Sequence, residues 1–215
     1  VMYFTPDRAA RVKHLDPARS FSSNESEFID QIYEPPLQYH YLKRPYELEP
    51  ATLTGMPKVT FLDEEGNKLP ADTREPAYSL YELEIKPGIL YQPHPSFARN
   101  EDGSFTYDFK TFEDSADYLV LDDFKESGTQ ELVADDYIYQ IKRLADPKRL
   151  APLRSLLSDY IVGMSELSVK AAEARKSMQP NDWLDLRQYE MEGLTKIDDH
   201  RFTIRLKGKY PQFKY

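Results

Sequence analysis

The stretch ELVADDYIYQIKRLADP, residues 131–147, joins two adjacent carboxylates to apolar residues that recur at roughly helical spacing. This spacing predicts an amphipathic helix over residues 134–145. Neighbouring helical residues point about 100° apart, so Asp135 and Asp136 cannot readily converge on one proton or one metal ion. In the first turn they complement exposed amide groups and the helix dipole. We therefore interpret the two acids as the start of a helix and not as a catalytic pair.

Alternating apolar and polar residues predict strands elsewhere. In YSLYELEIKPG, alternation places Tyr81, Leu83 and Ile85 on one face, and HRFTIRLKG near the carboxyl end has the same pattern. DEEGN between two short runs favours a hairpin, and RVKHLDP favours a short strand that ends at an Asp-Pro turn. Strands are thus expected at 78–85, ended by the Lys86-Pro87-Gly88 turn, and at 200–208, with a short strand at 11–17. Hairpins are expected around Gly66 and at the Asp102-Gly103 turn.

Helix start and stop signals supplement this pattern. In SSNESEFIDQIYE, Ser23 or Asn24 can cap a helix, and Pro35 and Pro36 end it. Further helical patterns cover about 152–160 and 166–178, the last rich in alanine, lysine and glutamate. Sheet segments interrupted by helices indicate an α+β or mixed α/β fold.

The composition excludes several function classes. Acidic residues outnumber basic ones by 37 to 28, for a net charge of −9, so we expect no nucleic-acid partner. The chain has no cysteine, which rules out disulfides, thiolate catalysis and cysteine-ligated zinc. Its four histidines are scattered, and no GxSxG, P-loop or GxGxxG motif occurs. We therefore predict no catalytic residue, no metal site and no cofactor, and we do not expect an enzyme.

Four blocks of sequence carry a family resemblance. In order they are VKHLDPARSFSSNESEFIDQIYE, YELEIKPGILY, GTQELVADDYIYQIKRLADP and IDDHRFTIRLKGKYPQFKY, spread over residues 12–215. Together they resemble the amino-terminal part of the family 5 extracellular solute-binding proteins, which are oligopeptide- and dipeptide-binding receptors of bacterial ABC importers. The chain departs from that pattern at Val133, where the family often has threonine, so the helix cap is expected to fall to Glu131 or Asp135 or to be lost.

The resemblance implies a type II periplasmic-binding-protein clam-shell, of which this chain would be a fragment. Residues 1–35 would begin the main domain of lobe I, and residues 36–215 would form its extra small domain. The segment at about 91–132 would be an enlarged loop, since common relatives have a much shorter connection there. The second lobe would be absent from this stretch.

The same resemblance implies a ligand site. In peptide-binding relatives an extended segment soon after LDP pairs with the ligand backbone, and it maps onto Ser20, Phe21, Ser22 and Ser23. A further ligand-approaching position maps onto Leu153. The alternative is that Phe21 packs in the core and the serines cap the helix.

The implied function is a non-enzymatic, monomeric receptor that captures peptide, or a related small solute, for an ABC permease in the inner membrane. Its location would be periplasmic or lipid-tethered on the cell surface. Two alternatives stay open: a glycoside hydrolase that uses the 16 tyrosines and the carboxylates along a groove, and an acidic extracellular interaction module that uses the long insertion.

Overall fold

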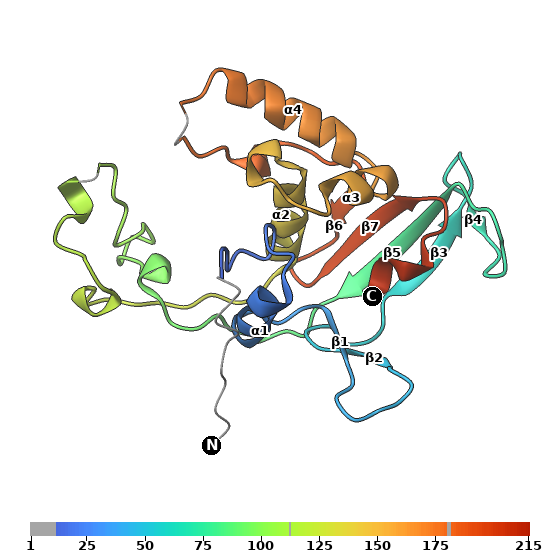
Figure 1. Cartoon of the computed structure of the whole chain (residues 1–215), viewed down its shortest axis with the longest axis horizontal. Coiled ribbons are helices and arrows are strands. Elements are labelled where there is room, and N and C mark those ends of the chain that lie inside the picture. The colour runs from blue at the N-terminus through green and yellow to red at the C-terminus, as the bar shows by residue number, and fades with distance from the viewer. Residues whose placement is uncertain (1–11, 112, 180–181) are drawn as a thin grey trace. The chain divides into compact units, whose positions relative to one another are not determined.

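A five-stranded antiparallel sheet is the centre of the protein, as seen in a computed structural model that describes residues 12–111, 113–179 and 182–215. The strand order is β4–β3–β5–β7–β6 (Figure 1). The strands are β3 (Lys58–Leu62), β4 (Lys68–Leu69), β5 (Tyr78–Glu84), β6 (Leu194–Lys196) and β7 (Arg201–Lys207). The predicted hairpin around Gly66 is confirmed as β3–β4, with Gly66 at φ +85° in the turn.

The core lies on one face of this sheet. Tyr81 on β5 pairs with Ile204 on β7, and Leu83 pairs with Phe202. Directly paired residues share a face, and all four side chains are buried. The Phe202 ring stacks on Tyr137 with ring centroids 5.9 Å apart. The alternation predicted for both strands is therefore confirmed. The apolar face that it creates lies toward the helices.

Helices α2 (Ala134–Ala145) and α3 (Arg154–Tyr160) contact this sheet, and α4 (Met164–Lys176) packs against both of them (Figure 1). The bounds predicted for α2 are confirmed. Helix α4 begins two residues earlier than predicted because Gly163, at φ +80°, serves as its N-cap. A Cβ at Gly163 would lie 2.7 Å from the amide nitrogen of Glu192, so only glycine fits there. The prediction of a mixed α and β fold is confirmed.

The amino-terminal part contributes α1 (Ser23–Ile32) and the small hairpin of β1 (Leu37–Tyr39) and β2 (Leu48–Pro50). The strand predicted at 11–17 is wrong for residues 12–17, and residue 11 lies outside the described residues. The amides of Lys13 and His14 donate to the carboxylate of Glu25 at 2.9 and 3.1 Å instead of to a neighbouring strand. Short 3₁₀ turns complete this unit: η4 (Pro147–Arg149), η5 (Leu186–Gln188) and η6 (Pro211–Lys214).

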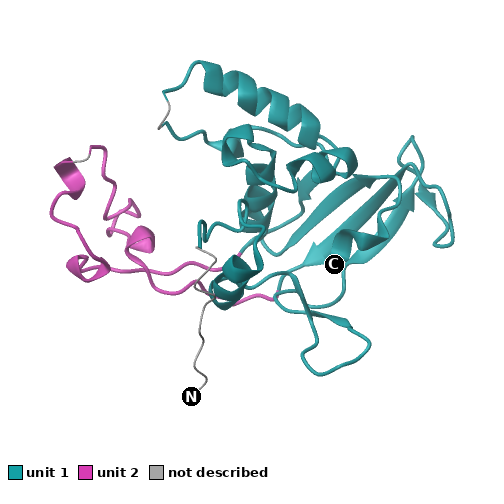
Figure 2. Cartoon of the chain, in the orientation of Figure 1, with its two compact units in different colours: residues 1–85, 133–215 teal, residues 86–132 magenta. Residues whose placement is uncertain are grey.

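Residues 86–132 form a compact unit of their own, and the described residues within 1–85 and 133–215 form the other, which we call the main unit (Figure 2). Four rings, of Tyr107, Phe109, Tyr118 and Phe124, pack with centroids 4.6 to 6.4 Å apart. The unit contains η1 (Pro95–Phe97), η2 (Glu113–Ser115) and η3 (Leu121–Asp123), and Arg99 bridges Phe105 across the predicted Asp-Gly turn. This division differs from the boundary at residue 35, which concerns the domains of a whole receptor and stays a prediction.

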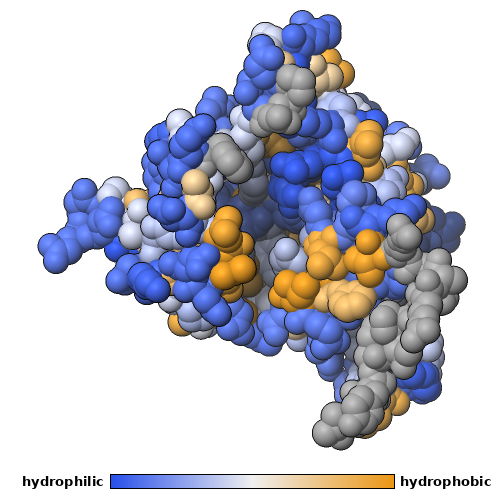
Figure 3. Space-filling view, turned by 60° about the vertical axis from the view of Figure 1, so that its left-hand side comes forward, coloured by the Kyte–Doolittle hydropathy of each residue, from blue (hydrophilic) through white to orange (hydrophobic). Residues whose placement is uncertain are grey.

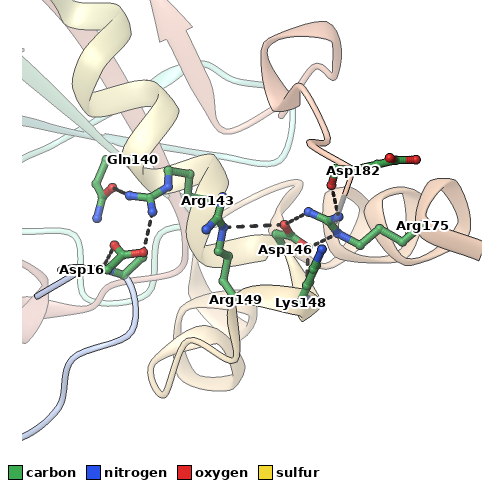
Figure 4. A network of polar contacts seen from close by, with 9 residues as sticks. Asp16, Gln140, Arg143, Asp146, Lys148, Arg149, Arg175 and Asp182 are labelled. Carbon is green, nitrogen blue, oxygen red and sulfur yellow. Dashed lines mark hydrogen bonds and ion pairs between the residues drawn. The ribbon is translucent and has the colours of Figure 1, made fainter. Parts of the chain in front are cut away.

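A buried carboxylate joins the end of α2 to α4 in the main unit. Asp146 is only 1% exposed, and Arg175 of α4 donates to its two oxygens at 2.9 and 2.6 Å (Figure 4). The amide of Lys148 adds a bond of 3.0 Å. Burial alone would raise the pKa of Asp146, but the hydrogen bonds from Arg175 and Lys148 and the charges of Arg175 and Arg149 outweigh it and lower that pKa below its ordinary value.

Removing the cation from this pair should destabilise the protein. We expect Arg175→Gln to lower the free energy of unfolding by about 3 kcal/mol, because it leaves a buried carboxylate without its main partner. Urea unfolding measures the effect. Lys176→Gln, one residue further along and paired with Glu173 on the surface, should change the same quantity by less than about 0.5 kcal/mol. Equal effects of the two substitutions would contradict the assignment.

Acid should weaken the same contact. Because the pKa of Asp146 is lower in the folded protein, its contribution is present above the ordinary value of about 3.9 and is lost as pH falls through the lower, folded-state pKa. The difference in unfolding free energy between wild type and Asp146→Asn should therefore shrink between about pH 6 and about pH 3. A difference that stays constant over this interval would show that the charge of Asp146 contributes nothing.

Candidate functional site

The predicted ligand segment, Ser20 to Ser23, leads into α1. Ser22 is the N-cap with extended backbone (φ −114°, ψ 136°), and Ser23 is the first helical residue. The cap therefore lies one residue before Ser23 and two residues before Asn24, the two predicted positions. The Ser22 hydroxyl contacts the side chain of Asn24 and makes no capping bond to the backbone. Ser22 thus leads into the helix with extended backbone.

Glu25 holds this segment from inside the protein. Its carboxylate is 3% exposed and accepts hydrogen bonds from the Ser20 hydroxyl at 2.8 Å and from the amides of Lys13 and His14. The Ser20 hydroxyl and the Lys13 amide lower the pKa of Glu25 below its usual range in spite of burial, with a further contribution from His14. A charged carboxylate in the first turn of α1 therefore holds together both ends of the segment that precedes the helix.

A second contact attaches the segment to α2. Arg143 donates to Asp16 at 2.6 Å and to Gln140 at 2.7 Å, and both ion-pair partners are largely buried (Figure 4). Asp16 in turn accepts from the amide of Ala18 at 3.0 Å. The turn before Ser20 is therefore anchored to the helix layer as well as to α1.

Phe21 and Ser22 form the open part of the segment. Phe21 is 75% exposed, so it does not pack in the core of the described chain. Within the described residues, the amide and carbonyl of Phe21 and the amide of Ser22 make no hydrogen bond. Exposed, extended backbone with open donor and acceptor groups is what strand addition by a peptide requires. A ligand role for Ser20 to Ser23 stays a prediction.

Leu153 lies at the N-cap of α3 and is partly exposed. Its carbonyl accepts from the Leu157 amide at 2.9 Å. In the parts of the chain that the structure describes, no hydrogen bond joins Leu153 to Ser20–Ser23. The structure thus does not link these predicted positions directly, and a ligand contact of Leu153 stays a prediction.

The acid pair at the start of α2 has separate structural contacts. Asp136 accepts from the Val133 amide at 2.9 Å, and Asp135 pairs with Lys196 at 2.6 Å. Val133 is the N-cap and makes no side-chain capping bond, so of the three predicted outcomes the loss of the cap is confirmed. Neither Glu131 nor Asp135 replaces it, because Asp136 binds the Val133 amide and Glu131 accepts from the amide of Gly88. Both acids lie in the first turn of α2, as the sequence predicted.

Two searches of the described residues give negative results. Over residues 12–111, 113–179 and 182–215, no three histidine or acidic side chains gather as metal ligands. Over the same residues, no helix is long and apolar enough to cross a membrane.

The structure also contains a groove that sequence reasoning missed. It has a volume of about 550 Å³ and runs between α2 and the segment that carries Trp183 and Arg187. Trp183 is 59% exposed and is the only tryptophan of the chain. A lone tryptophan after the turn residues Pro-Asn-Asp is a signal that could have pointed to this surface. Elsewhere, exposed apolar side chains interrupt a mostly hydrophilic surface (Figure 3).

Comparisons with known proteins show a likeness of fold. No protein-family model and no curated protein matches the chain. The solved structure of the pheromone receptor PrgZ, described with its mode of peptide binding, matches 94% of this chain with a TM-score of 0.50 and 17% identity. OppA of Listeria monocytogenes bound to peptide matches 93% with a TM-score of 0.45 and 12% identity. This chain spans 26% and 25% of those proteins. The likeness to PrgZ shows that this chain shares the fold of part of that protein.

Loss of the Glu25 charge should release the segment before α1. In Glu25→Gln, the amides of Lys13 and His14 should exchange hydrogen with solvent several-fold faster, because a neutral amide is a weaker acceptor than a carboxylate. Hydrogen exchange followed by NMR or mass spectrometry measures this. Asp30→Asn, on the exposed side of α1, is the matched control and should leave both rates unchanged. Unchanged exchange in Glu25→Gln would contradict the anchoring role.

Proposed function

We propose that this chain forms one wall of the ligand cleft of a solute-binding receptor that captures peptides. The observation that carries the proposal is the exposed backbone of Phe21 and Ser22, which is open to hydrogen bonding and anchored from behind by Glu25. Main-chain pairing recognises a peptide without regard to its sequence, because every residue offers the same amide and carbonyl. Recognition of this kind suits a receptor for many peptides.

The shared fold supports the proposal. PrgZ is described by its peptide binding, and this chain spans about a quarter of that protein. The proposal therefore includes a second lobe that supplies the opposite wall of the cleft. Closure of a two-lobed clam-shell stabilises the bound state only if the ligand contacts both lobes. Residues 12–215 without such a lobe would bind peptide weakly.

The biological setting is also part of the proposal. The receptor would act without catalysis, as a monomer, and would deliver peptide to an ABC permease from the periplasm or from a lipid tether at the cell surface. The glycoside hydrolase alternative requires two carboxyl groups held about 5 to 10 Å apart around the substrate. The acid pair at 135–136 is already occupied by the Val133 amide and by Lys196.

An acidic interaction module is the second candidate, and one observation favours it. Leu119, Val120 and Leu121 in the unit 86–132 are 85%, 60% and 58% exposed. Six acids and one lysine surround them in sequence between residues 113 and 126. A partner with an apolar pocket surrounded by basic residues would be complementary to this surface in hydrophobicity and charge.

Peptide capture is tested at Phe21 with the full-length protein and pools of short peptides. We expect Phe21→Pro to weaken binding about tenfold in isothermal titration calorimetry, because proline removes an amide that would pair with the ligand. Phe21→Ala retains the amide and is the matched control, and it should bind more tightly than the proline variant. Equal affinities of the two variants, or no peptide binding by wild type, would refute the proposed mode.

The second candidate is separated from the first in the same assay. Tyr91 and Gln130 are joined by a backbone bond of 2.9 Å, so residues 92–129 can be replaced by an Asn-Gly turn. Under the receptor proposal this replacement leaves peptide affinity unchanged. Loss of affinity on the replacement would assign the ligand contacts to the unit 86–132 instead.

A further inference from the structure

The groove beside α2 has the dimensions and lining of a small-molecule site. Its volume of about 550 Å³ lies within the range of ligand pockets. All of its walls belong to the main unit, and the segment Ser20–Ser23 takes no part in them. The lining residues are Asp135, Asp136, Ile138, Tyr139, Lys142, Trp183 and Arg187.

One wall of the groove is aromatic. The Trp183 side chain is more than half exposed, although indole is among the side chains that gain most from burial. The Arg187 guanidinium lies 5.2 Å from its ring centroid and is held in place by two bonds of 2.8 Å to Asp185. Tyr139 packs against the small core around Leu184 and Leu186, so this part of the wall is also supported from behind.

The acidic side chains that line the groove already have partners, whereas its lysine differs from them. Asp135 is paired with Lys196, and Asp136 accepts from the Val133 amide. Lys142 lies seven residues along the same helix, about 10.5 Å from Asp135 at the rise of an α-helix. No carboxylate of the described residues lies within 4.0 Å of its ammonium group. Burial lowers the pKa of Lys142, against the more distant charges of Asp135, Glu190 and Asp185.

A partly buried ammonium group without an ion-pair partner would gain most from an anionic ligand. We propose that this groove binds a small carboxylate ligand with a flat aromatic body, its carboxylate at Lys142 and its ring against Trp183 and Tyr139. A cationic ligand would meet the like charge of Lys142, and Asp135 is already paired with Lys196. The site does not depend on the proposed peptide cleft.

Three probes with the same aromatic body test this inference on the full-length protein. They are N-acetyl-L-phenylalanine, its uncharged amide, and phenethylamine, which carries a positive charge. Isothermal titration calorimetry measures the affinity of each probe. We expect the carboxylate to bind about tenfold more tightly than the amide, because a charged hydrogen bond to Lys142 is gained. Phenethylamine should bind more weakly than either.

Variants assign this preference to a side chain. Lys142→Gln should remove the tenfold preference for the carboxylate, and Lys142→Arg should retain it. Lys170→Gln, an exposed lysine on α4, removes the same charge at a distance and should behave as wild type. Lys142→Gln should leave peptide affinity unchanged, which separates this test from that of the proposed function.

Several results would overturn the inference. They are equal binding of the carboxylate and the amide by wild type, tighter binding of phenethylamine, and absence of saturation up to about 10 mM carboxylate. The comparison of the three probes on wild type tests the preference for a carboxylate even if a variant fails to fold.

Discussion

The pairing of β5 with β7 is the constraint on which the rest of the main unit depends. The two strands are more than a hundred residues apart, yet seven residue pairs join them from Tyr78–Lys207 to Glu84–Arg201. A slip of one residue would turn Tyr81, Leu83, Phe202 and Ile204 from the core to the other face, so burial determines the register. The buried Ser79 hydroxyl, which donates to the Gly208 carbonyl at 2.6 Å, secures one end.

Two buried carboxylates connect the elements around this sheet. Glu25 gathers the chain that precedes α1, and Asp146 joins the end of α2 to α4. Each carboxylate accepts several hydrogen bonds, and each has a lowered pKa because those bonds outweigh burial. A buried carboxylate is tolerated only with such partners, so each one restricts its neighbours to a single arrangement. These contacts attach irregular segments of the chain to the core.

The two candidate sites differ in how they would recognise a ligand. At Phe21 and Ser22 the open groups belong to the main chain, which suits a class of ligands with a common backbone. In the groove beside α2 the open group is the ammonium of Lys142, and Trp183 lines the same groove, which suits a small ligand of defined charge. Asp16 and Arg143 attach the segment before Ser20 to α2, the helix that also lines the groove.

Local patterns in the sequence were enough to predict the regular elements. Alternation identified both central strands and the faces they bury, and helical spacing identified α2 to its ends. Proline and glycine marked the β3–β4 turn and the end of α1. These signals are local. A buried face imposes a short-range period on the side chains of a helix or strand, and a turn depends on a few adjacent residues.

Only the tertiary structure decided which polar groups have partners. The sequence pattern suggested a strand at 11–17, yet Glu25 accepts from the amides of Lys13 and His14. At the start of α2 the amide of Val133 is bound by Asp136, and neither Glu131 nor Asp135 caps the helix. Nothing local pairs Asp146 with Arg175, which is 29 residues away, or brings Trp183 beside Lys142. The sequence by itself thus determined periodicity and turns. The tertiary structure determined which carboxylates are buried and which backbone and ammonium groups stay open to a ligand. Burial of a polar group depends on which segments, distant in the sequence, pack around it and exclude water.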